Sequence, residues 1–304
     1  MIDRPRWPAL VLTAGLATRL QPLSSVRAKA ALPVAGMPLV TRILRGLREA
    51  GVERAVLNLH HHADSITRIV GDGSADGLAV RYSWEREILG SAGGPARAVP
   101  LLAADRFLIV NGDTLADVDL PAMARQHLDT NALVTMAVVG GRTGYNGVIA
   151  EPNGIVRGFG RDAGAFHFIG VQIVNASVFA GVDPDTKSET VHGIYPDLIA
   201  SRPGAIRVFH AGGEFFDIGS PRDYLDTAIA IAAREGQPLD RGRDCVVAAD
   251  ASLAKTLLWD RVSVGAGARL TECVVADGVN VPAGAELSLC SLVMRDNRMV
   301  ATPF

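Results

Sequence analysis

The sequence predicts an α/β fold over the first two thirds of the chain and a short solenoid of stacked coils at its end. Short apolar runs alternate with helical patterns as far as about residue 234. Beyond that residue the helical period stops and a six-residue rhythm takes its place. With 304 residues, 48% of them hydrophobic, the chain has enough apolar material for one large domain and a small one.

The alternation begins with a buried strand at Ala9–Thr13 and a helix at Pro38–Ala50, whose proline lies in the first turn. Because strands that are joined through helices run parallel, this order predicts a Rossmann-like sheet, mixed but mainly parallel, with helices on both faces. The further elements expected up to residue 110 are strands at Arg54–Leu59, Leu78–Trp84 and Phe107–Val110 and helices at Ala63–Val70 and Pro95–Leu102.

Later strands follow one another more closely, which favours antiparallel pairing beside the parallel core. A closing helix is expected at Tyr224–Arg234, and the glycine- and proline-containing stretch Glu235–Asp244 is typical of a linker. The sequence therefore predicts a large domain over residues 1–238 and a small one over residues 239–304. The later strands are expected at Leu133–Val139, Gly147–Ala150, Ile155–Phe159 and Phe166–Val174.

The small domain carries the six-residue rhythm. Val264, Leu270, Ala276 and Pro282 each precede a small or short polar residue, and a looser echo runs back to Val247. The pattern resembles the hexapeptide repeat of left-handed parallel β-helices, which stack coils around a shared core. Only two or three coils fit, so the coils need support from the first domain or from another subunit. We expect them to mediate homo-oligomer contacts.

Composition narrows the possible partners and the compartment. A formal net charge of −2 gives no electrostatic footprint for nucleic acid or an acidic membrane surface. The three cysteines, Cys245, Cys273 and Cys290, form no C-x-x-C pair, which argues against a zinc site or a disulfide framework and suits a reducing compartment. The apolar start Ala9–Ala17 is too short to span a membrane. A cytoplasmic protein is expected.

The loop after the first strand is the first candidate site. It reads Leu-Thr-Ala-Gly-Leu-Ala-Thr-Arg-Leu from Leu12 to Leu20. A glycine-containing turn at this place lets backbone N–H groups approach a ligand, and the fork of Arg19 suits phosphate oxygens. The loop is neither G-x-G-x-x-G nor a P-loop, so a dinucleotide fold and a P-loop enzyme are disfavoured.

The continuation makes the pattern specific. An Arg-Ala-Lys-Ala-Ala-Leu-Pro-Val stretch follows from Arg27, and the whole segment resembles the signature of the sugar-1-phosphate nucleotidyltransferases, with Arg19 and Lys29 on that family's two cationic positions. Ala17 stands where the family usually has glycine, and its methyl group disfavours positive φ. The nucleotide-binding residues that the resemblance implies are Ala14, Gly15, Thr18, Arg19, Lys29, Ser91 and Gly93.

Two acidic motifs complete the resemblance. Asp113 ends the run Phe107–Asp113 in an Asn-Gly-Asp element, and Asp217 lies in Phe-Asp-Ile-Gly-Ser-Pro, which resembles the family's W-x-D-I-G-T-P. The resemblance implies that both carboxylates bind Mg²⁺, a hard cation that also takes phosphate oxygens.

The implied chemistry needs no catalytic base. A sugar 1-phosphate oxygen, already anionic since a phosphate monoester has a second pKa of about 6, attacks the α-phosphorus of a nucleoside triphosphate as pyrophosphate departs. We assign Asp113, Lys29 and Arg19 as the catalytic residues: Lys29 at the α-phosphoryl group, Arg19 at the leaving pyrophosphate and Mg²⁺ on Asp113 and Asp217.

The substrate is less well defined. The Leu-Gly-Ser-Ala-Gly-Gly cluster containing Ser91 and Gly93 resembles the base-pocket loop of the mannose-1-phosphate guanylyltransferase and muramate-1-phosphate uridylyltransferase branches, so GTP and UTP both stay open. Gly147 resembles a sugar-site residue. The family's E-K-P lysine is missing after Phe159, and Arg161 is its candidate substitute. These departures leave open a catalytically inactive paralogue that binds an NDP-sugar and regulates a partner.

Two other readings are weaker. His60-His61-His62 suggests a metal site, but successive residues on a strand point to opposite faces, so a polar strand end before a helix is the better interpretation. An acyltransferase on the repeats would need more coils and a histidine, and the last histidine, His210, precedes them.

Overall fold

The computed structural model describes residues 7–140, 147–162 and 164–304. The chain divides into two compact units, each assembled from separate segments. The first, here called the sheet unit, takes Met1–Gly15, Ile43–His61 and Val70–Phe215. The second, the coil unit, takes Leu16–Arg42, His62–Ile69 and Phe216–Phe304. The division into domains at residues 238 and 239 stays a prediction.

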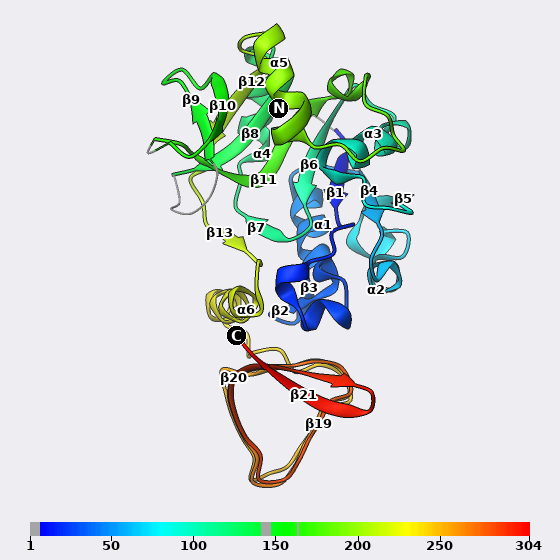
Figure 1. Ribbon diagram of the computed structural model, residues 1–304, viewed down its shortest axis with the longest axis vertical. Coiled ribbons are helices and arrows are strands. Elements are labelled where there is room, and N and C mark those ends of the chain that lie inside the picture. The colour runs from blue at the N-terminus through cyan, green and yellow to red at the C-terminus, as the bar shows by residue number, and fades with distance from the viewer. Residues whose placement is uncertain (1–6, 141–146, 163) are drawn as a thin grey trace. The chain divides into compact units, whose positions relative to one another are not determined.

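The sheet unit is organised around a seven-stranded sheet in the order β12-β8-β11-β6-β1-β4-β5 (Figure 1). β1 runs parallel to β4 and β6, β4 to β5, and β8 to β12, whereas β11 is antiparallel to both β6 and β8. The predicted mixed, mainly parallel sheet is confirmed. Its strands are β1 Ala9–Leu12, β4 Arg54–Leu59, β5 Ala79–Trp84, β6 Arg106–Asn111, β8 Val134–Val139, β11 His167–Asn175 and β12 Ile206–His210.

Helices cover both faces of this sheet. Phe107 and Ile109 of β6 share a buried cluster with Ala92 of α3, whereas the intervening Leu108 lines a small apolar cavity with Leu120 and Ala124 of α4. Since successive residues of a strand point to opposite faces, α3 and α4 lie on opposite sides. The helices of the described chain are α1 Leu39–Glu49, α2 Ala63–Val70, α3 Gly90–Leu102, α4 Leu120–Asp129, α5 Tyr195–Ser201 and α6 Pro221–Glu235.

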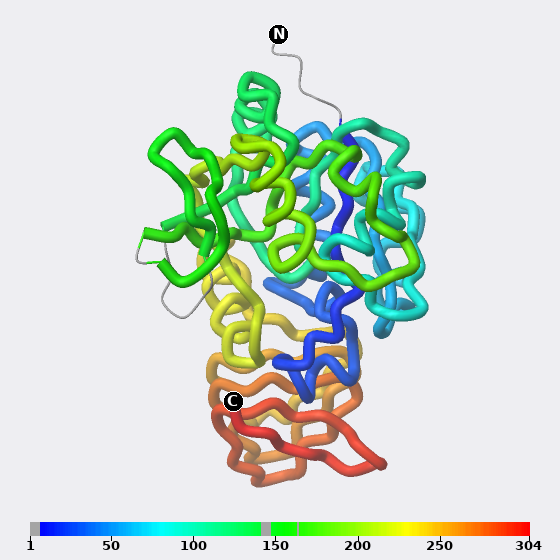
Figure 2. Tube along the Cα trace, turned by 45° about the horizontal axis from the view of Figure 1, so that its top comes forward, coloured from blue at the N-terminus to red at the C-terminus, as the bar shows by residue number. Residues whose placement is uncertain are grey.

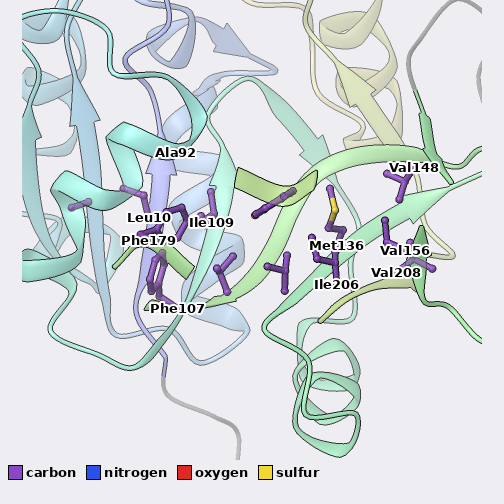
Figure 3. Packing of buried hydrophobic residues seen from close by; sticks show 14 of the residues in the cluster. Leu10, Ala92, Phe107, Ile109, Met136, Val148, Val156, Phe179, Ile206 and Val208 are labelled. Atoms are coloured by element: carbon purple, nitrogen blue, oxygen red, sulfur yellow. The ribbon is translucent and has the colours of Figure 1, made fainter. Parts of the chain in front are cut away.

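The core of the sheet unit is continuous from β1 to β12. Figure 3 shows Phe107 and Phe179 side by side, and their rings stack with centroids 6.0 Å apart. A β-hairpin of β9 Gly147–Ala150 and β10 Val156–Gly160 adds Val148 and Val156 to the same cluster, which confirms the predicted antiparallel pairing of the later strands. The short strands outside the coils are β2 Pro33–Val34, β3 Met37–Pro38, β7 Thr114–Ala116 and β13 Phe215–Asp217.

The coil unit ends in stacked coils (Figure 2). Parallel strands pair Val246 with Ser263 and Ser263 with Asn280, so each coil advances by 17 residues. The last strand, β21 Arg298–Pro303, pairs antiparallel with β20. The other coil strands are β14 Val246–Val247, β15 Ser252–Ala254, β16 Leu257–Leu258, β17 Ser263–Val264, β18 Arg269–Val275, β19 Asn280–Val281 and β20 Glu286–Arg295.

The six-residue rhythm slips once in every coil. Val264, Leu270, Val275 and Val281 all lie in the buried core of the coils, and the step from Leu270 to Val275 is one residue shorter than the other two. The sequence rhythm therefore matches this core at Val264 and Leu270. Ala276, which is also fully buried, and Pro282, which is exposed, each follow a core valine by one residue. Left-handed backbone at Asp244, Arg261 and Gly278, again 17 residues apart, turns one corner of the coils. No helix of the described residues is long and apolar enough to cross a membrane.

Candidate functional site

The carboxyl ends of β1 and β6 bring two predicted site segments of the sheet unit together. The strands are parallel neighbours with Leu12 opposite Asn111, so the loop after β1 and the Asn-Gly-Asp element start at the same edge. The Gly112 N–H donates to the Leu12 carbonyl at 2.9 Å. A Cβ on Gly112 would lie 2.6 Å from that oxygen and 2.7 Å from Thr13 Cγ2, so glycine is needed for this approach. Half-buried Asp113 follows directly.

The start of the loop after β1 is held by hydrogen bonds to the neighbouring strand β4. Asn58 of β4, 4% exposed, accepts the Thr13 N–H at 2.7 Å, and its carbonyl accepts the Thr13 hydroxyl at 2.5 Å. Asn58 Nδ2 donates to Glu85 Oε1 at 2.7 Å, and Glu85 Oε2 accepts the Leu89 N–H at 2.9 Å. This buried chain of hydrogen bonds joins the loop to the start of α3. Sequence reasoning missed it, although polar Asn58 within an apolar strand was a signal.

Of the predicted nucleotide-binding residues in the sheet unit, Ala14 is 3% exposed and Gly15 opens onto space. At the start of α3, the Ser91 hydroxyl donates to Glu189 Oε2 at 2.7 Å and accepts the Thr190 N–H at 2.8 Å. Gly93 is buried, and a Cβ there would lie 2.6 Å from the Thr186 carbonyl. Ser91 and Gly93 therefore anchor the segment 186–190 over α3, a packing role the sequence did not predict.

The two predicted sugar-binding residues come from one hairpin. Gly147 pairs with Gly160 across β9 and β10, and exposed Arg161 follows Gly160 directly. A Cβ on Gly147 would lie 2.5 Å from that of Ala165, so close packing requires a glycine there. The residues 141–146 and 163, which belong to the motifs around Gly147 and Arg161, lie outside the described residues.

The coil unit carries the cationic residues of the loop. Ala17 has φ 49° and ψ 46°, a left-handed conformation, and it begins a 3-10 turn that contains exposed Thr18 and Arg19. The conformation that usually calls for glycine is thus adopted by alanine here. A Cβ on Gly219 would lie 3.2 Å from Arg19 Nη1, so the guanidinium lies against the glycine two residues after Asp217. Arg19 and the Asp217 motif thus lie together within the coil unit.

Lys29, half-buried, begins another 3-10 turn, Lys29–Ala31. Asp217 ends β13, and three residues later Ser220 caps α6: Ser220 and Asp223 form a capping box, with Pro221 at the first helical position. The Ser-Pro of the acidic motif therefore also serves as a helix start. The sequence had predicted the start of this helix three residues too late, at Tyr224.

The two predicted metal ligands belong to different units: Asp113 to the sheet unit and Asp217 to the coil unit. Among the residues that the structure describes, no three His, Cys, Asp or Glu side chains gather as ligands for a metal ion. The His60-His61-His62 run lies between the end of β4 and the start of α2, as a polar strand end should, and His60 Nδ1 contacts the Glu85 carbonyl at 3.0 Å.

Comparison with known proteins places this geometry in a family. The model of the family described as "Nucleotidyl transferase" matches residues 8–234. A mannose-1-phosphate guanylyltransferase of Mycobacterium tuberculosis is 37% identical over 131 residues, which are 43% of this chain and 36% of that protein. An N-acetylmuramate alpha-1-phosphate uridylyltransferase of Neisseria meningitidis is 43% identical over 115 residues, 38% of this chain and 50% of that protein. The matched part thus spans half or less of these relatives.

Solved structures agree on the fold. HddC from Yersinia pseudotuberculosis superposes with a TM-score of 0.64 at 23% identity, over 74% of this chain and 99% of that one. A putative glucose-1-phosphate thymidylyltransferase from Bacillus anthracis superposes with a TM-score of 0.67 at 16% identity, over 78% and 98%.

Proposed function

The chain belongs to the nucleotidyl transferase family, and from that premise we propose that it transfers a nucleoside monophosphate from an NTP to a sugar 1-phosphate, giving an NDP-sugar and pyrophosphate. The observation that carries the proposal is the Leu12–Gly112 contact, which sets Asp113 beside the loop that starts at Thr13. The relatives are named for guanylyl or uridylyl transfer to sugar 1-phosphates, which supports the same reaction.

The proposed roles follow from charge and position. Backbone N–H groups of Ala14, Gly15 and Thr18 would cradle the triphosphate, and the Arg19 fork would hold the departing pyrophosphate. Lys29 would neutralise charge that develops on the α-phosphoryl group. The attacking phosphate oxygen carries its own negative charge, so no side chain has to remove a proton.

Magnesium fits the donor set. Mg²⁺ keeps several waters and is held by one or two carboxylates together with substrate phosphates, so it does not need a cage of three protein ligands. Asp113 and Asp217 supply such oxygens, each beside a segment proposed to bind phosphate. When bound, the ion would screen the negative charges of the two reacting phosphates.

Two nucleotides are proposed as donors, and the sugar is not narrowed further. The relatives use guanylyl or uridylyl donors, so GTP and UTP are the proposed nucleotides. Ser91 and Gly93 would border the base through the backbone at the start of α3. Gly147 and Arg161 would border the sugar phosphate, with Arg161 in place of the family's lysine.

The test is a panel of NTPs and sugar 1-phosphates, read out by pyrophosphate release, with and without EDTA. Asp113→Asn, which keeps the side-chain shape, should lower turnover at least about 100-fold. Asp129→Asn, at the end of α4, is the matched control and should act like the wild type. Turnover by Asp113→Asn at the wild-type rate would remove Asp113 from the site. An NDP-sugar bound without any turnover would favour the inactive regulatory paralogue.

The coils add two proposals. They would form a small left-handed β-helix domain over residues 239–304, and they would mediate homo-oligomer contacts. Val246, 68% exposed on β14, is the test position for the last of these. The mass of the full chain by light scattering should exceed that of one chain and fall in Val246→Asp; a one-chain mass for the wild type would contradict an oligomer.

The three free cysteines support a cytoplasmic location.

A further inference from the structure

We infer that the C-terminal coils hold the segment that carries Lys29 in its working position, and that Arg27 and Asp240 are the positioning residues that do so. The segment, residues 27–36, and the coils belong to the same compact unit. The inference rests on the proposed function for the role of Lys29, but the contacts themselves do not depend on it.

Arg27 ties the start of the segment to two neighbouring coils. Its Nε donates to Asp277 Oδ2 at 2.7 Å, and its Nη2 donates to Asp277 Oδ1 at 2.6 Å and to Asp260 Oδ2 at 2.8 Å. The three side chains are only 15–17% exposed, and the guanidinium also lies 5.3 Å from the ring centroid of Trp259. All of these partners come from the coils. Arg27, two residues before Lys29, is therefore committed to carboxylates rather than available to a phosphate.

Asp240 ties the other end of the segment. This carboxylate, 6% exposed, accepts the Ala35 N–H at 2.9 Å on one oxygen and the Gly36 N–H on the other. Burial raises the pKa of Asp240, and the two N–H groups oppose that rise. Each oxygen of the side chain thus satisfies one backbone donor of the turn between β2 and β3.

A third tie lies between these two. The Tyr224 hydroxyl of α6 donates to the Pro33 carbonyl at 2.6 Å and accepts the Trp259 Nε1–H at 3.1 Å. Tyr224 and Trp259 are both 0% exposed. Lys29 therefore sits in a short segment that is fixed before it, after it and through its own β2 strand.

Loss of Arg27 would do more than remove a contact. Asp260 and Asp277 stack in adjacent coils, where the Asp260 N–H donates to Asp277 Oδ1 at 3.0 Å. Without the guanidinium, two partly buried carboxylates would repel each other beside the segment. Replacing Asp277 by Asn as well should relieve that repulsion, while the tie to the segment stays absent.

The first test measures hydrogen exchange in the full-length protein. Arg27→Ala and Asp240→Asn should each raise the exchange rate of the amides in residues 28–36 at least about 10-fold, because the hydrogen-bonded closed state is lost. Arg27→Lys, which cannot bridge both carboxylates through a planar fork, should give a smaller increase. Val264→Ala, a truncation in the coil core at a residue that makes none of these ties, is the stability control and should leave these amides protected.

The second test measures kinetics at a temperature where every variant is folded. Arg27→Ala should lower kcat/KM about 10–100-fold through a misplaced Lys29. A cavity of about 440 Å³ lies beside Arg27 and is open to small solutes, so added guanidinium ion should restore part of the rate in Arg27→Ala but not in Lys29→Ala. Arg269→Ala, which breaks an exposed ion pair with Glu286 between coils, should keep the wild-type rate.

The outcomes separate the two claims. Unchanged exchange of residues 28–36 in both Arg27→Ala and Asp240→Asn would overturn the positioning role, whatever the activity. If exchange increased in these two variants but the wild-type protein turned over no NTP, the proposed function would be refuted and the positioning role would stand. Equal exchange increases in Val264→Ala would reduce Arg27 to a general stability effect and would also overturn the inference.

Discussion

Gly112→Ala isolates the contact that sets Asp113 against the loop after β1. Gly112 is not one of the glycines with a positive φ, so an alanine there meets no backbone strain. Its Cβ, however, would lie 2.6 Å from the Leu12 carbonyl oxygen, about 0.8 Å inside the 3.4 Å at which ordinary contact begins. The nearest atoms include main chain, so the two strand ends must separate. Overpacking of this kind costs about 1–3 kcal/mol.

Gly112→Ala should lower turnover as well as stability. A displacement approaching 1 Å of groups that position substrate lowers rates by about 100-fold. Urea unfolding and pyrophosphate release measure the two quantities separately. Gly46→Ala in α1, where an added Cβ meets nothing within 4 Å, is the matched control and should raise the free energy of unfolding by about 0.5–1 kcal/mol. If Gly112→Ala had the same free energy of unfolding and the same turnover as the wild type, the close approach of β1 and β6 would be wrong.

Three further changes test other parts of the structure. Tyr224→Phe should lower the free energy of unfolding by about 1–3 kcal/mol in urea titrations, since it leaves the buried Trp259 N–H without its acceptor. Ala17→Gly should raise that free energy by up to about 1 kcal/mol, because it relieves a left-handed alanine; a loss of stability would contradict this. Burial lowers the pKa of His127 below 6.5, so the free energy of unfolding should fall as the pH drops below 6.5, by at most about 1.4 kcal/mol per pH unit. His127→Gln should flatten that slope.

The elements that the sequence predicted are those that local patterns encode. The helix expected at Ala63–Val70 and the strand at Gly147–Ala150 have the observed bounds, because period and flanking residues mark both. The helix expected from Pro95 begins at Gly90 instead. There the segment 186–190 packs closely against the glycines of the first turns, a distant contact that no local pattern reports.

The site divides in the same way. Motif spacing was enough to propose Arg19, Lys29, Asp113 and Asp217, since each stands in a recognisable run of residues. Asn58, which holds Thr13, belongs to no such run. Its role depends on where the parallel strands of the sheet place a side chain. Likewise, the coil strands could be expected from their rhythm, but the carboxylates of Asp260 and Asp277 gain a role only because folding brings Arg27 to them.

The ties at Arg27 also set an order of assembly. Asp277 follows Arg27 by 250 residues, and a ribosome adds about 5–20 residues per second, so roughly 12–50 s of synthesis separate the two partners. The Lys29 segment is thus synthesised well before the coil residues that support it. A nascent chain of this protein should therefore turn over substrate at a reduced rate until the coils have left the ribosome, and a chain that ends before the coils should keep that reduced rate.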